Sequence, residues 1–342
     1  MPGPTEEVIA PKVVVSVVFF VTLLNQASLA QTNVNDVHVV PRQVSPVAAS
    51  AVPLASIKAV DGSMLHVVKT DAKLVLIPVS VTDPMQRLVS GLQAENFELF
   101  EGKKPQEIRH FSTEDLPVSV GIILDASGSM RSKMNRVREA VTEFCESANP
   151  QDEFFLIEFS DQPRLVEDFT SAPEDIEKEL LFTQPSGRTA LLDAIYMGLH
   201  KMKEAKYAKK ALLIISDGGD NHSLYVEKDV KAAAKESDVM IYAIGTFDRY
   251  VPTPEETRGP ALLSELAQPT GGQAFTLENE RELPAVASHI GRALRTQYVL
   301  AYRPEEMPHD GKWHKVQVKL RLPKKLAFLR AHAKTGYYAP AD

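Results

Sequence analysis

Residues 120–130 read Val-Gly-Ile-Ile-Leu-Asp-Ala-Ser-Gly-Ser-Met, an apolar run that ends on one carboxylate and two hydroxyls. Such a run is typical of a strand that is buried on both faces in a parallel sheet. Open α/β sheets bind their ligands at the carboxyl ends of these strands. Asp125, Ser127 and Ser129 offer oxygen atoms but no nitrogen or sulfur, so they suit a hard cation, Mg²⁺ or Mn²⁺. We expect Gly128 to relieve backbone crowding between the two serines.

Two later segments supply further oxygen ligands. Thr189 opens the stretch Thr-Ala-Leu-Leu-Asp-Ala-Ile, which has helical spacing, and Asp217 ends a second apolar run, Ala-Leu-Leu-Ile-Ile-Ser-Asp. A D-x-S-x-S motif alone is a weak signal, because short polar turns are common. Together with the threonine and the second aspartate it predicts one metal site formed by three loops.

With these residues the chain resembles a von Willebrand factor A domain, whose metal-ion-dependent adhesion site (MIDAS) consists of D-x-S-x-S, a threonine and an aspartate after a later strand. The matching residues are Asp125, Ser127, Ser129, Thr189 and Asp217. The resemblance implies that both serines bind the ion directly, the threonine directly or through water, and the aspartates mostly through water. It also implies that a glutamate or aspartate of a partner protein completes the coordination.

Residues beside these loops are candidates for a rim that contacts the partner, namely Arg188, Asp220, Asn221 and His222. Arg188 could hold a carboxylate in a bidentate fork. Asp220 and Asn221 could support the ligands by hydrogen bonds, or they could cap the next helix. For His222 we favour an exposed loop position over a role as a metal ligand. We expect Asp193 to order the loop by hydrogen bonding.

The order of the predicted elements indicates an α/β fold with a doubly wound, mostly parallel sheet, because strands alternate with helices through residues 116–294. Short strands with turn signals precede this A domain in residues 71–115 and follow it in residues 295–342. We expect these two segments to pair as one small β-sandwich-like module into which the A domain is inserted. The layout resembles that of a group of exported bacterial A-domain proteins.

The first thirty residues resemble an export signal. Lys12 precedes the apolar residues 13–24, and Ala-Ser-Leu-Ala at 27–30 ends in small residues. The apolar stretch is shorter than the ~20 residues of a membrane span. We therefore expect cleavage after Ala30 and an exported protein (periplasmic, cell-surface or secreted), with an uncleaved membrane anchor as the alternative. Residues 31–70 are expected to form a flexible linker.

Composition limits the possible functions. The net charge of −7 and the lack of a basic helix argue against a nucleic-acid partner. Cys145 is the only cysteine, so the chain forms no internal disulfide, and its helical spacing with Val137 and Val141 predicts a buried thiol.

Two alternatives to metal-dependent binding remain open. A metal-dependent hydrolase would need a base or nucleophile beside the ion, whereas the serines here would be occupied as ligands. A metal-independent structural A domain is the other alternative. We expect a non-enzymatic module that binds a protein or peptide through its metal ion.

Overall fold

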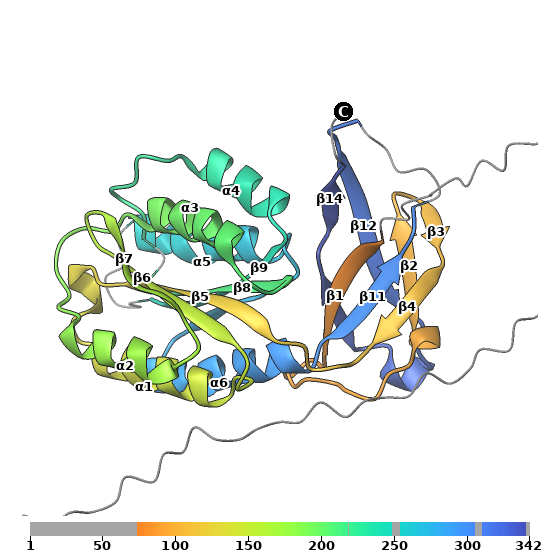
Figure 1. Cartoon of the computed structure of the whole chain (residues 1–342), viewed down its shortest axis with the longest axis horizontal. Coiled ribbons are helices and arrows are strands. Elements are labelled where there is room, and N and C mark those ends of the chain that lie inside the picture. Colours follow the sequence, from red (N-terminus) through yellow and green to blue (C-terminus); the bar gives the residue numbers. More distant parts are fainter. Residues whose placement is uncertain (1–73, 218, 248–253, 305–309, 340–342) are drawn as a thin grey trace, which may run out of the picture. The chain divides into compact units, whose positions relative to one another are not determined.

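The computed structural model describes residues 74–217, 219–247, 254–304 and 310–339 (Figure 1). The chain divides into the units Met1–Val67 and Val68–Asp342, and the described residues belong to the second. The predicted export signal and linker lie outside the described residues. In the described ranges no helix is both long enough and apolar enough to span a membrane.

A six-stranded sheet in the order β10-β9-β8-β5-β6-β7 forms the centre of the α/β part (Figure 1). Its strands are β5 (Val118–Asp125), β6 (Glu153–Phe159), β7 (Pro163–Thr170), β8 (Lys209–Ser216), β9 (Val239–Thr246) and β10 (Ala274–Leu277). All neighbours are parallel except β7, which returns antiparallel to β6 through a hairpin. Every residue of β5 and β9 is buried, as expected for strands with helices on both faces.

Helices cover both faces of this sheet. One apolar core contains residues of α1 (Met134–Glu146), α2 (Pro173–Phe182) and α6 (Leu283–Arg295). The other contains residues of α3 (Leu191–Lys201), α4 (Glu227–Glu236) and α5 (Pro254–Ala267). A Cβ placed on Gly198 of α3 would lie 2.7 Å from Cδ1 of Ile123 in β5. Glycine therefore allows α3 to approach the strand that leads to the candidate site.

The remaining strands form two antiparallel sheets, in the orders β13-β1-β11-β4 and β14-β12-β2-β3. They are β1 (Val75–Thr82), β2 (Phe97–Glu101), β3 (Lys104–Gln106), β4 (Ile108–Ser112), β11 (Tyr298–Tyr302), β12 (Trp313–Leu320), β13 (Arg330–Ala333) and β14 (Gly336–Tyr338). β1 pairs with β11, and β2 pairs with β12, so segments before and after the α/β part share the same sheets. We refer to these strands as the β module. Its core includes Ile77, Leu99 and Tyr298.

The predicted fold class, a mostly parallel α/β sheet together with antiparallel sheets, is confirmed. The short edge strands β10 and β14 were not predicted, because four or three residues carry too little periodicity. Helix α3 ends at Lys201, and a 3₁₀ turn, η3 (Met202–Glu204), follows it. The other 3₁₀ turns are η1 (Ala94–Asn96), η2 (Gly128–Met130), η4 (Glu280–Glu282) and η5 (Lys324–Leu326).

Candidate metal-binding site

The two candidate aspartates follow neighbouring parallel strands. Asp125 is the last residue of β5 and Asp217 comes directly after β8, where Leu124 lies opposite Ile215. The chain leaves β5 toward β6 on one side and returns at β8 on the other side. The carboxyl ends of β5 and β8 are therefore a topological switch point, where open α/β sheets bind their ligands.

Hydrogen bonds join four of the five predicted ligands into one cluster. Asp125 accepts the backbone N–H of Ser127 at 2.9 Å and the hydroxyl of Ser216 at 2.6 Å. The Oγ atoms of Ser127 and Ser129 lie 3.0 Å apart, and the Ser129 hydroxyl donates to a carboxylate oxygen of Asp217. The β5 loop and the β8 loop thus bring their oxygen atoms together.

The fifth predicted ligand, Thr189, lies on the loop before α3. Its N–H donates to Oδ1 of Asn221 at 3.0 Å, and its carbonyl accepts the N–H groups of Asn221 and His222 at 3.0 and 3.2 Å. Gly128 N–H donates to the carbonyl of Gly187 at 3.1 Å and so ties this loop to the β5 loop. In the described part of the chain, the hydrogen bonds that place Thr189 all involve its backbone.

One glycine of these loops is needed for its conformation. Gly187 has φ +79°, a left-handed conformation, and a Cβ there would lie 2.6 Å from Oδ2 of Asp161. At Gly128 the nearest atom to a Cβ would be the Gly187 carbonyl oxygen at 3.5 Å, an ordinary contact. Apart from its two neighbours in the chain, Gly128 thus has room for a side chain, and its expected role between the two serines stays a prediction.

Both carboxylates of the cluster are buried. Asp125 is fully buried and Asp217 is 2% exposed. Burial, followed by the charge of Asp217, raises the pKa of Asp125 to about 7, against hydrogen bonds from Ser127 and Ser216 that lower it. Ser129 is exposed, so the cluster opens to solvent at this residue.

The donor set fits a hard divalent cation. It consists of two carboxylates and three hydroxyls, and Mg²⁺ prefers oxygen ligands of this kind. Among the described residues, no three His, Cys, Asp or Glu side chains gather closely enough to hold a metal. A metal site here therefore depends on the hydroxyls as much as on the acids.

The predicted rim residues take different positions. Arg188 is exposed, but its N–H and its Nε donate to Oδ1 of Asp161 at 3.1 and 3.2 Å. Its guanidinium group already has a carboxylate within the chain, so an acid of a partner would have to compete with Asp161. His222 is half-buried rather than exposed.

The remaining two rim residues support the loops. Asn221 holds the backbone of Thr189. Asp220 accepts the N–H of Leu192, in the first turn of α3, at 3.3 Å and the hydroxyl of Ser223 at 2.5 Å. Asp220 thus stabilises the start of the preceding helix α3, and neither residue caps α4, which begins at Glu227.

An exposed apolar segment, Leu224–Val226, lies beside this loop and was not predicted from the sequence; we call it the apolar tip. Leu224, Tyr225 and Val226 are 91%, 41% and 58% exposed. Asp193 accepts the N–H groups of Leu224 and Tyr225, each at 2.9 Å, and the Tyr225 ring stacks on Tyr196 at 4.0 Å. The expected role of Asp193 in ordering the loop is confirmed. Three consecutive apolar residues in a loop after Asp217 were the available signal.

Residues 120–219 match the family model of the von Willebrand factor type A domain. The match covers β5 to β8 and the loop that follows β8, and the parallel sheet with its two helical layers has a fold like that of a von Willebrand factor type A domain.

Curated relatives match about a third of the chain or slightly more. It is 27% identical over 139 residues to inter-alpha-trypsin inhibitor heavy chain H4 of Bos taurus, which covers 36% of this chain and 15% of the relative. It is 28% identical over 156 residues to integrin alpha-X of Homo sapiens, which covers 39% of this chain and 13% of the relative. The match thus spans a small fraction of the length of these relatives.

Solved structures are also similar. A von Willebrand factor type A protein from Catenulispora acidiphila has a TM-score of 0.47 at 13% identity, over 80% of this chain and 75% of that chain. The vWF domain of a type V pili tip protein from Porphyromonas gingivalis has a TM-score of 0.44 at 13% identity, over 53% of this chain and 95% of that chain.

Proposed function

We propose that the protein binds another protein or a peptide through a divalent cation, Mg²⁺ or Mn²⁺. The proposed ligands are Asp125, Ser127, Ser129, Thr189 and Asp217. The observation that supports this proposal is the connected cluster of carboxylates and hydroxyls at the switch point between β5 and β8. The family resemblance adds that such a site is an adhesion site.

The residue types explain how the cluster would act. Hydroxyls are neutral, and the resemblance implies that Asp125 and Asp217 bind mostly through water. Direct ligation by Ser127, Ser129 and Thr189 would therefore leave the bound cation electrophilic. The bound ion would then supply an electrophilic position for a carboxylate. Because Ser129 is the exposed member of the cluster, a glutamate or aspartate of the partner would approach on its side.

The apolar tip suggests what surrounds that acid in the partner. Burial of a fully exposed leucine contributes about 1.5–3 kcal/mol, and Leu224 is 91% exposed. Asp193 already fixes the backbone of the tip, so little entropy is lost when a partner orders it. We therefore expect a partner segment in which an apolar side chain lies near the acid.

A metal-independent structural role is the second candidate. The hydrogen bonds among Ser127, Ser129 and Asp217 favour it, because they satisfy part of the cluster without an ion. We propose no catalytic role, since the only residues assigned to the cluster are hydroxyls and acids that would serve as ligands.

A pull-down tests the proposal. The full chain would be immobilised and exposed to envelope extracts, in Mg²⁺ or in EDTA, as wild type, as Asp125→Ala and as the control Asp229→Ala, an exposed aspartate of α4. We expect wild type and Asp229→Ala to capture the same protein, EDTA to release it, and Asp125→Ala to capture none. Capture that persists in EDTA would contradict the metal-dependent proposal and favour the structural role. A further variant, Leu224→Ser, should weaken capture without removing its dependence on metal.

A further inference from the structure

Two sheet edges meet away from the candidate metal cluster. β10 is the edge strand of the six-stranded sheet, and β13 is the edge strand of one sheet of the β module. Thr270, ahead of β10, forms an antiparallel bridge with Lys334, which directly follows β13. Thr335 N–H also donates to the carbonyl of Pro269 at 3.0 Å. The two edges are thus joined at one end.

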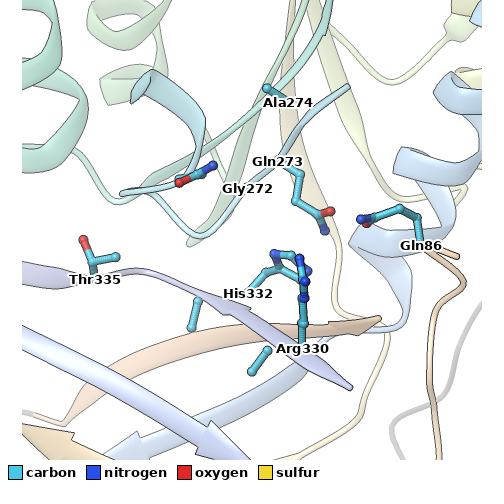
Figure 2. Close-up of a pocket in the computed structure, with 10 residues that line it drawn as sticks. Gln86, Gly272, Gln273, Ala274, Arg330, His332 and Thr335 are labelled. Atoms are coloured by element: carbon cyan, nitrogen blue, oxygen red, sulfur yellow. The ribbon is translucent and has the colours of Figure 1, made fainter. Parts of the chain in front are cut away.

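Past this junction a cavity of about 590 Å³ lies between the edges. Residues of the segment ahead of β10, of β13 and of the turn after β1 line it. Figure 2 shows the amide ends of Gln273 and Gln86 facing each other, with the Arg330 and His332 side chains reaching toward them from β13. A volume of this order is within the range of small-ligand sites.

Gln273 supplies the most specific observation. Gln273 is 7% exposed, and its Nε2 has no hydrogen-bond partner among the described residues. A buried amide N–H without an acceptor is unfavourable, and native proteins contain few of them. Because this amide is directed into the cavity (Figure 2), an acceptor oxygen on a ligand would satisfy it.

Arg330 supplies a positive charge. Its side chain is exposed, and no acid of the described residues forms an ion pair with it. His332 does not add a second charge at neutral pH, because burial, and then the charge of Arg330, lower its pKa. His332 Nε2 lies 2.9 Å from Oγ1 of Thr82. One arginine, able to form a bidentate pair, is therefore the cation of this cavity.

Gln86 is held in place by its own turn. It has φ +62°, which is uncommon for a residue other than glycine. Asp83 fixes the turn by accepting the N–H groups of Met85 and Arg87, both at 2.9 Å, and Nε of Arg87 at 2.7 Å. The amide of Gln86 is thereby presented to the cavity from the β module.

We propose that this cavity binds a carboxylate, held by the guanidinium of Arg330 and by the amide donors of Gln273 and Gln86. The carboxylate could belong to a small free acid or to an acidic side chain of a peptide. Because Gln273 precedes β10 and Arg330 belongs to β13, the ligand would link the A domain to the β module. This function is separate from the proposed metal site and uses none of its residues.

Calorimetric titration of the full chain tests the proposal. The probes are succinate, the blocked peptide acetyl-Ala-Glu-amide and its neutral counterpart acetyl-Ala-Gln-amide. EDTA is present throughout, so binding at the metal cluster does not contribute. We expect at least one acid to bind, and the neutral peptide to bind about tenfold more weakly or not at all. Binding of succinate alone identifies a free acid, and binding of the acidic peptide alone identifies a peptide ligand.

Variants locate the binding. Arg330→Ala should weaken binding by about tenfold or more, and Gln273→Leu should weaken it while leaving the melting temperature unchanged or raised, since it removes an unpaired buried amide. Arg321→Ala removes an exposed arginine of the β module outside the cavity and should bind as wild type does. The proposal is overturned if neither acid binds at about 10 mM, a concentration that detects millimolar affinity. It is also overturned if Arg330→Ala binds as tightly as wild type.

Discussion

Replacement of Gly187 by alanine should destabilise the A domain, whereas the same replacement at Gly128 should not. At φ +79° an alanine enters a left-handed conformation that costs about 1–2 kcal/mol. Its Cβ would also stand 2.6 Å from Oδ2 of Asp161. Asp161 is 54% exposed and can move, but it would then weaken its contacts with Arg188, worth up to about 1 kcal/mol at an exposed site.

The comparison of the two variants isolates this effect. Each replacement lowers the entropy of the unfolded chain by the same amount, about 0.4–1 kcal/mol, which cancels in the difference. At Gly128 the nearest atom would be 3.5 Å from the Cβ, so no clash opposes it. We therefore expect Gly187→Ala to be about 2 kcal/mol less stable than Gly128→Ala.

Thermal unfolding in EDTA measures this difference without a contribution from bound metal. A difference of ~2 kcal/mol corresponds to about 4–8 °C in melting temperature for a domain of this size. Equal melting temperatures, or a less stable Gly128→Ala variant, would refute the reasoning from backbone conformation.

Three further predictions concern metal, thiol chemistry and pH. Mg²⁺ at a hundredfold excess over Kd should raise the free energy of unfolding of the wild type by about 2.7 kcal/mol, and with it the melting temperature. Asp217→Ala should abolish this shift in melting temperature. An unchanged shift in that variant would place the ion elsewhere. Cys145 should react with a thiol reagent only on unfolding, because it is 5% exposed and burial, with the charges of Glu177 and Glu174, raises its pKa to about 12; rapid labelling of the folded protein would contradict this. Burial lowers the pKa of His289 and His332, so the unfolded chain binds more protons than the folded chain just below the usual histidine pKa of ~6.5. The free energy of unfolding therefore decreases as the pH falls through that region. Urea unfolding between about pH 7 and 5 should show a smaller decrease in the double variant His289→Gln/His332→Gln than in wild type, and identical profiles would exclude this contribution.

The spacing of apolar residues along the chain was sufficient to predict the strands and helices that pack against a core on one or both sides. The uniform apolar runs that end at Asp125 and Asp217 predicted buried parallel strands, and both runs are strands of the six-stranded sheet. Helical spacing around Cys145 placed a helix and a buried thiol where the structure has them. These predictions succeed because burial imposes a period of its own on each segment.

The metal ligands themselves were selected by residue type, position after a strand and family resemblance. The structure brings Asp125, Ser127, Ser129 and Asp217 into hydrogen-bond contact, and it places Thr189 on the adjoining loop. Whether an ion binds them stays a prediction for the experiments above.

The amino-acid sequence by itself determined most of the strands and helices, though not the short edge strands β10 and β14, and it showed which oxygen-bearing residues follow the central strands. These properties depend on neighbours along the chain. Only the tertiary structure decided that a side chain at position 187, unlike one at position 128, would clash. It also decided that Arg188 donates a hydrogen bond to Asp161, and that Gln273 and Arg330 line one cavity from two different sheet edges. Each of these depends on atoms that are far apart in sequence. Their contacts arise from strand order and loop conformation, which the spacing of apolar residues along the chain does not predict.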